Sequence, residues 1–131
     1  MLSIGQVAER TGLSVHALRF YEREGILAHP VERESNGRRV YSDADVEWLI
    51  LCTRLRASGM PLPAIRKYAD LVRQGLGNEK DRLTLLREHR DRVLGQLAEL
   101  EQCLGIISKK IEWYEEALAE GAPDPLINEC R

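Results

Sequence analysis

The sequence predicts a mainly α-helical protein in which a winged helix-turn-helix domain is followed by a long coiled-coil dimerisation helix. Three observations lead to this fold class. Two short amphipathic segments flank a Gly-containing turn within residues 1–25. An Asn-Gly pair, a strong local signal for a β-hairpin, follows at Asn36-Gly37. A heptad repeat of apolar residues then occupies most of residues 81–120.

The composition is that of an ordinary globular chain, and its 131 residues suffice for one compact domain or for a small domain plus an extension. Hydrophobic residues make up 44% and charged residues 31%, which excludes a disordered or fibrous protein. No apolar run approaches the roughly 18 to 20 residues of a membrane span. The N-terminus lacks the layout of a signal peptide, so we expect a cytoplasmic protein. Three widely spaced cysteines form neither a disulfide framework nor a CxxC metal site: Cys52, Cys103 and Cys130.

The net charge of −2 hides an asymmetry along the chain. Residues 1–76 carry 11 Arg/Lys against 9 Asp/Glu, whereas residues 77–131 carry 8 against 12. All but one of the basic residues in the first part are Arg. With a pI near 6.0, this pattern argues against indiscriminate coating of nucleic acid. It leaves room for one small basic face that meets DNA at one place.

The first two helices are predicted from their capping residues. Ser3 and Gln6 have the spacing of a capping box, which begins a helix that ends at the break in residues 11–13. Ser14 is a predicted N-cap for a second helix, which ends near Gly25. Two short helices joined by a tight turn form a helix-turn-helix.

A wing and two further helices follow. The Asn-Gly pair places a hairpin within residues 34–41, beside the helix-turn-helix. Ser42, with Asp45 three positions on, is predicted to cap a third helix over about residues 43–57. Its inward-facing side chains are expected to be Val46, Leu49, Ile50, Thr53 and Ala57. Pro63 suits the first turn of a fourth helix.

The C-terminal half carries a seam spaced 3, 4, 3, 4: Leu83, Leu86, Arg90, Val93, Leu97, Leu100, Leu104, Ile107, Ile111, Tyr114 and Leu118. A helix over residues 81–120 would be roughly 60 Å long at 1.5 Å per residue. So long and narrow a stripe cannot be buried on a small domain, and the simplest partner is a second copy of the same helix. The predicted organisation is residues 1–75 as DNA-binding domain, 76–80 as hinge, 81–120 as dimerisation helix and 121–131 as tail.

Candidate DNA contacts lie on the exposed side of the second helix and on the wing: His16, Ala17, Arg19, Phe20 and Arg23, with Arg38, Arg39 and Tyr41. The guanidinium group of Arg donates two hydrogen bonds to guanine or binds a phosphate, and small residues let the helix backbone approach the DNA closely. Two other interpretations stay open. The arginines are solvated surface residues, or the head of a coiled-coil assembly module binds protein instead of DNA. No nucleophile–base pairing, phosphate loop or metal spacing predicts an enzyme.

Many positions match one family pattern at fixed spacing: Ile4-Gly5-Gln6-Val7-Ala8, Thr11-Gly12-Leu13-Ser14, Leu18-Arg19-Phe20-Tyr21-Glu22-Arg23-Glu24-Gly25-Ile26-Leu27, Gly37-Arg38-Arg39-Val40-Tyr41 and Ser58-Gly59-Met60-Pro61-Leu62. With these residues, the first 75 positions resemble the DNA-binding domain of the MerR family of bacterial transcription regulators. The long helix is similar in position and length to the family's dimerisation helix. The resemblance implies that the two helices pair antiparallel.

The resemblance also implies a function. Family dimers bind double-stranded promoter DNA at a pseudo-palindrome between the two promoter elements, and they bend and untwist this spacer for RNA polymerase. Deforming DNA costs several kcal/mol, which contacts on both arms offset. The loop over residues 59–62 resembles a second wing that contacts backbone phosphates. The full set of expected DNA-contacting residues is Ser14, His16, Ala17, Arg19, Phe20, Tyr21, Arg23, Arg38, Arg39, Tyr41 and Met60.

Effector sensing is a separate question. Metal-sensing relatives have Cys at the start of the dimer helix, where this chain has residues 78–80 without Cys, so neither a metal nor another cofactor is expected. A subgroup that responds to aldehydes and other electrophiles resembles this chain in length, but its reactive Cys falls at Arg54. Cys52 lies two residues earlier, about 200° around the helix. It is either a small core residue or, with Arg54 and Arg56 nearby, a nucleophile that senses a small-molecule effector.

Overall fold

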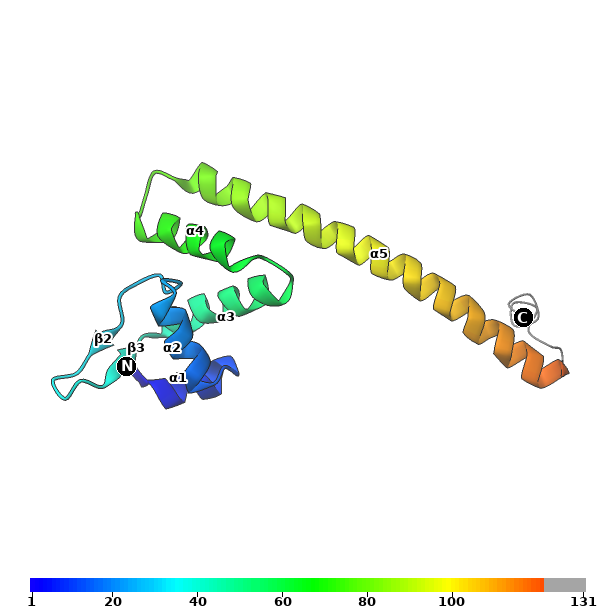
Figure 1. The fold of residues 1–131 in the computed structure, drawn as a ribbon, viewed down its shortest axis with the longest axis horizontal. Coiled ribbons are helices and arrows are strands. Elements are labelled where there is room, and N and C mark those ends of the chain that lie inside the picture. The colour runs from blue at the N-terminus through cyan, green and yellow to red at the C-terminus, as the bar shows by residue number, and fades with distance from the viewer. Residues whose placement is uncertain (122–131) are drawn as a thin grey trace. The chain divides into compact units, whose positions relative to one another are not determined.

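The structure is a computed structural model that describes residues 1–121; the predicted tail beyond Gly121, with Cys130, lies outside the described residues. The elements in chain order are β1 (Leu2–Ser3), α1 (Ile4–Thr11), α2 (Val15–Arg23), β2 (Glu32–Arg33), β3 (Arg39–Tyr41), α3 (Asp43–Ala57), α4 (Leu62–Arg73) and α5 (Glu79–Glu120), as Figure 1 shows. This order confirms the predicted fold class.

Two compact units make up the chain: residues 1–90, called the head below, and the part of α5 from Asp91 onward. The head extends past the predicted boundary at residue 75 because Leu85 and Leu86 of α5 pack against its core. The predicted domain limits (1–75, 76–80, 81–120 and 121–131) stay a prediction.

Capping side chains begin α1 and α3, as predicted. The Ser3 backbone N–H donates to Gln6 Oε1 at 2.8 Å, and the Gln6 N–H donates to Ser3 Oγ at 3.2 Å. Ser42 and Asp45 exchange the same two hydrogen bonds at 2.9 and 3.1 Å. Each box satisfies backbone N–H groups that a helix start leaves without an intrahelical partner.

The wing is built on a small antiparallel sheet with strand order β1-β3-β2. Its hairpin joins β2 to β3 through a turn in which the Gly37 N–H donates to the Glu34 carbonyl at 2.9 Å. Gly37 has a φ of 84°, a conformation that glycine adopts without steric cost. The strand β1 was not predicted from the sequence; it pairs Leu2 with Tyr41 and so ties the N-terminus to the base of the wing.

The core of the head is one cluster that α1, α2, β3, α3 and α4 share. Its buried members are Val7, Leu18, Tyr21, Ile26, Tyr41, Val46, Leu49, Cys52, Leu55, Met60 and Ile65. The prediction that Ile50 and Ala57 face inward is wrong, because both are exposed and α3 buries Cys52 and Leu55 instead. Steps of three residues advance the buried stripe around the helix. The stripe turns because α3 packs against α1 and also against α4, beside which it lies in Figure 1.

Four successive backbone carbonyls at the end of α2, those of residues 24–27, are held by side chains of α3 and α4. Arg66 Nε donates to the first at 2.8 Å, and Trp48 Nε1 donates to the third at 2.7 Å. Arg73 Nη1 donates to the other two. Two guanidinium groups therefore lie at the C-terminal end of α2, where positive charge is favourable. This arrangement fixes α2 relative to α4.

We expect Arg66→Ala to lower the free energy of unfolding by about 1–2 kcal/mol, because two charge-assisted hydrogen bonds to Glu24 are lost at a half-exposed site. Lys67→Ala removes the neighbouring cation, which makes no ion pair among the described residues, and is the matched control. Urea unfolding at one fixed protein concentration measures both. Equal effects of the two changes would contradict a specific role for Arg66.

The unit from Asp91 onward is one helix with an uncovered apolar stripe. Seam residues of the predicted heptads are exposed along it: Leu97, Leu100, Leu104, Ile107, Ile111, Tyr114 and Leu118. A run of this length exposed on a single helix marks an interaction surface. Among the described residues, no helix is both long and apolar enough to cross a membrane.

Candidate nucleic-acid interface

The helix α2 presents a basic face. Ser14 caps the helix by accepting from the Ala17 N–H at 3.0 Å. The side chains of His16, Arg19 and Arg23 recur at helical spacing and are exposed, while Leu18 and Tyr21 on the other side enter the core. The packing that orients the helix therefore leaves its two arginines accessible to a ligand.

The aromatic pair on α2 lies under a guanidinium from α3. Arg56 is centred 5.6 Å from the Phe20 ring centroid and 5.9 Å from that of Tyr21. Phe20 and Ala17 are half-buried. A guanidinium at this distance is attracted to the ring faces and adds positive charge beside α2. Sequence reasoning did not place Arg56 in the interface, because no local pattern joins α3 to α2.

The wing is held against α2 by one carboxylate. Arg39 Nε of β3 donates to Glu22 Oε2 at 2.6 Å, and Arg33 of β2 lies 3.5 Å from Glu22 Oε1. Arg38, in the turn, is exposed. Arg39 is thus engaged within the protein rather than fully available to DNA. Arg33 is a basic wing residue that was not predicted from the sequence, although its cross-strand register with Arg39 follows from the hairpin.

Three residues of the expected DNA-contacting set lie in the core. Tyr21, Tyr41 and Met60 are 5%, 2% and 2% exposed, so most of the surface of each side chain is covered by the protein itself. Burial, followed by the charge of Glu22, raises the pKa of the Tyr41 phenol above its ordinary value. Their packing positions α2, β3 and the loop before α4, and a direct contact of these three residues with DNA stays a prediction.

The loop between α3 and α4 has a defined shape. The Met60 N–H donates to the Leu55 carbonyl at 2.9 Å and the Gly59 N–H donates to the Arg56 carbonyl at 3.0 Å, which is the Schellman arrangement at a helix end. Burial of Met60 pins this loop to the core while Gly59 stays exposed. The Ser58 hydroxyl oxygen lies 2.8 Å from His89 Nε2, which links the loop to α5.

Cys52 is 1% exposed, and burial raises the pKa of its thiol to about 12. Because the thiolate is the nucleophile, this environment disfavours reaction with an electrophile. Arg56, expected as a possible activator of the thiol, contacts the α2 aromatic rings instead. The structure therefore favours the interpretation of Cys52 as a core residue over that of an effector-sensing residue.

We expect iodoacetamide to modify Cys52 at least about 100-fold more slowly in the native protein than in urea, because reaction requires opening of the core. The folded thiol also keeps its proton to a higher pH than the unfolded one. Its contribution to stability is therefore constant below about pH 9 and is lost as pH rises from there towards 12. Mass spectrometry of labelled peptides tests the first statement, and rapid labelling of the native protein would contradict it.

Urea unfolding of the wild-type protein and of Cys52→Ala at alkaline pH tests the statement about stability.

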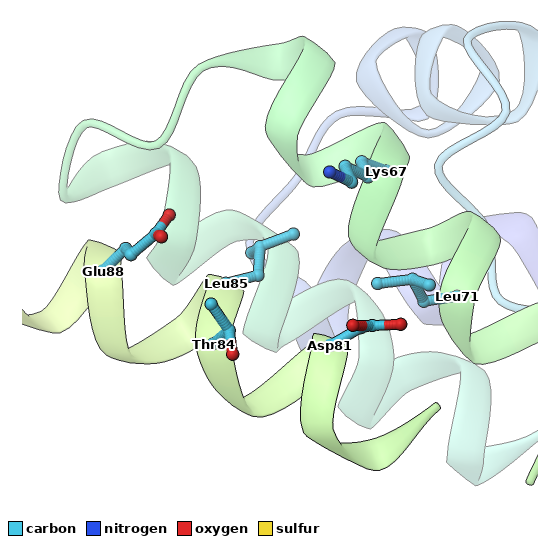
Figure 2. A pocket seen from close by; sticks show the side chains of 6 residues that line it. All are labelled: Lys67, Leu71, Asp81, Thr84, Leu85 and Glu88. Atoms are coloured by element: carbon cyan, nitrogen blue, oxygen red, sulfur yellow. The ribbon is translucent and has the colours of Figure 1, made fainter. Parts of the chain in front are cut away.

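A groove of about 340 Å³ opens in the head between α4 and the first turns of α5, as Figure 2 shows. Its lining residues are Lys67, Leu71, Asp81, Thr84, Leu85 and Glu88. One ammonium and two carboxylates line it, with no ion pair among these residues. Within residues 1–121, no three His, Cys, Asp or Glu side chains are grouped to hold a metal ion. A small-molecule effector stays a prediction.

The fold and this surface define a class: a winged helix-turn-helix protein with a basic face on its second helix and an uncovered apolar stripe on a long C-terminal helix. The family described as "MerR HTH family regulatory protein" matches residues 2–71, and the one described as "MerR, DNA binding" matches residues 46–105. The chain belongs to the MerR family, as the resemblance predicted. It is accordingly a DNA-binding transcriptional regulator.

Individual relatives agree. An HTH-type transcriptional regulator of Haemophilus influenzae is 35% identical over 117 residues, which cover 89% of this chain and 86% of that protein. The structure of HiNmlR, a MerR family regulator lacking the sensor domain and bound to promoter DNA, has a TM-score of 0.80 at 34% identity and covers 92% of this chain and 94% of that one. A MerR family transcriptional regulator from Listeria monocytogenes has a TM-score of 0.87 at 26% identity, covering 92% and 91%. The relatives are regulators, not enzymes.

Proposed function

We propose that two copies of this chain pair through the helix over residues 81–120 and bind a pseudo-palindromic promoter spacer in double-stranded DNA. The homodimer alters the twist and bend of the spacer and so controls RNA polymerase at that promoter in the cytoplasm. The observation that carries the proposal is the exposed row of His16, Arg19 and Arg23 on α2, beside a wing that carries Arg38. An exposed helix that carries Arg and His side chains can enter the major groove of DNA, and a basic wing can contact the phosphates beside it.

The contacts have separate roles. Arg19 and His16 read base edges, while Arg23 and the wing cations contact phosphates and set the register. Ser14 lies at the N-terminus of α2, where backbone N–H groups favour a phosphate. Ala17 lets the helix approach the bases closely. The likeness to HiNmlR, solved with promoter DNA, supports this assignment.

Pairing through α5 supports the same function, because a dimer places two reading helices on two half-sites. The exposed stripe from Leu97 to Leu118 provides the surface for pairing. Binding both arms supplies the free energy that deforming the spacer requires. A single head would have no second arm to hold the deformed DNA.

The test is binding of the full chain to the DNA upstream of its own gene and of its neighbours, against a scrambled duplex, at two salt concentrations. We expect tight binding to one pseudo-palindrome that lies between promoter elements. Weak, steeply salt-dependent binding to every duplex would mean phosphate attraction without readout. The protein-binding module would then be the better interpretation of the head.

A further inference from the structure

A single carboxylate joins α2 to both strands of the wing. Glu22 accepts from Arg39 of β3 at 2.6 Å and lies 3.5 Å from Arg33 of β2. Arg33 and Arg39 are directly opposite each other in the antiparallel register of the hairpin. The two oxygens of one side chain are therefore divided between two neighbouring strands.

Without Glu22, this arrangement would be unfavourable, because like charges directly opposite each other on two strands repel. Glu22 lies between them, and its side chain and that of Arg39 are only about a quarter exposed. The attraction is therefore less screened than that of a surface ion pair. Arg33 also donates from Nη1 to the Gly37 carbonyl at 3.0 Å, which extends the connection into the turn of the wing.

We propose that Glu22 is a positioning residue for DNA readout, which sets the wing at the spacing from α2 that the two elements need to contact one half-site together. The proposal rests on the proposed function, since it concerns how the same surface binds DNA. Glu22 itself contacts no base. It acts through Arg33 and Arg39, whose guanidinium groups it holds between the reading helix and the wing.

The direction in which DNA affinity changes when Glu22 is removed distinguishes a positioning role from simple repulsion between Glu22 and DNA. A carboxylate close to DNA repels the phosphates. If charge alone matters, removing that carboxylate therefore tightens binding to any duplex. Removing Glu22 also frees the wing from α2 and leaves two opposed guanidinium groups. Positioning therefore predicts weaker binding to the promoter half-sites together with unchanged or tighter binding to unrelated DNA.

The experiment compares Glu22→Gln with Glu32→Gln, each measured on the promoter duplex and on a scrambled duplex at two salt concentrations. Glu32 is the matched control, because it is an exposed wing carboxylate with no ion pair among the described residues. We expect Glu22→Gln to raise the dissociation constant for the promoter duplex about tenfold, which is about threefold for each of the two half-sites, and not to raise that for the scrambled duplex. Glu32→Gln should keep the wild-type ratio of the two constants.

Glu22→Asp keeps the charge but shortens the side chain by one methylene, so it should give an intermediate ratio even where Glu22→Gln unfolds; circular dichroism checks folding of each variant. Wild-type discrimination by both Glu22 variants would overturn the proposal, as would an equal loss on both duplexes. Lack of discrimination by the wild-type protein is a different result, because it would overturn the proposed function, and this inference with it.

Discussion

Replacing Arg19 with Ala should raise the dissociation constant for the promoter duplex about 100-fold, since one base contact worth roughly 1.4 kcal/mol is lost at each of two half-sites. Arg19 is exposed on α2 and makes no ion pair among the described residues, so it is available to DNA. Because its removal leaves the core untouched, the thermal midpoint and dimerisation should not change. Fluorescence anisotropy with promoter and scrambled duplexes measures the effect.

The matched control for Arg19→Ala is Arg92→Ala. Arg92 is an exposed arginine on α5, outside the heptad seam, and its loss changes the net charge by the same amount. It should bind the promoter duplex nearly as the wild-type protein does. If the two variants bind alike, Arg19 does not read DNA, and the assignment of α2 as the reading helix is wrong.

Replacing Leu104 with Glu should dissociate the dimer and with it abolish tight promoter binding. In a paired helix, the change would place two carboxylates in the apolar seam, where an unpaired charge is strongly unfavourable. A monomer binds only one half-site, so affinity should fall by at least about 100-fold once the second contact is no longer intramolecular. Sedimentation velocity gives the oligomeric state, and anisotropy gives the affinity.

Ile106→Glu provides the comparison for Leu104→Glu. Both side chains are exposed in the described chain, at 72% for Ile106 and 62% for Leu104, and they are only two positions apart. Ile106 lies outside the 3, 4 spacing of the seam. A dimer that survives both changes, or loses pairing equally with both, would contradict the heptad assignment.

The features predicted from sequence are those that local chemistry determines. The boxes at Ser3 and Ser42 involve residues three apart, so their spacing alone predicts where α1 and α3 begin. The long helix is predicted in the same way, because apolar residues recur at nearly every turn along it. The hairpin turn is predicted because glycine is the residue type that adopts a positive φ without strain, and Gly37 has a positive φ in the structure.

The features that were missed depend on residues far apart in the chain. Glu22 and Arg39 are 17 residues apart, and Trp48 donates to a carbonyl 22 residues away. No periodic pattern of apolar residues in the sequence predicts contacts between residues so far apart. Tyr41 likewise pairs with Leu2 of the two-residue strand β1, which is too short to leave a pattern in the sequence. A tyrosine beside two arginines therefore resembled a phosphate contact in the sequence and is a core residue in the structure.

The central claim is that a dimer reads two half-sites through α2 and the wing. Hydroxyl-radical footprinting of the full chain on the upstream promoter duplex tests it most directly. The account predicts two protected segments related by a pseudo-twofold axis within the spacer, with both segments lost together in Leu104→Glu. A single protected half-site of undiminished strength in that variant, or uniform weak protection by the wild-type protein, would contradict it.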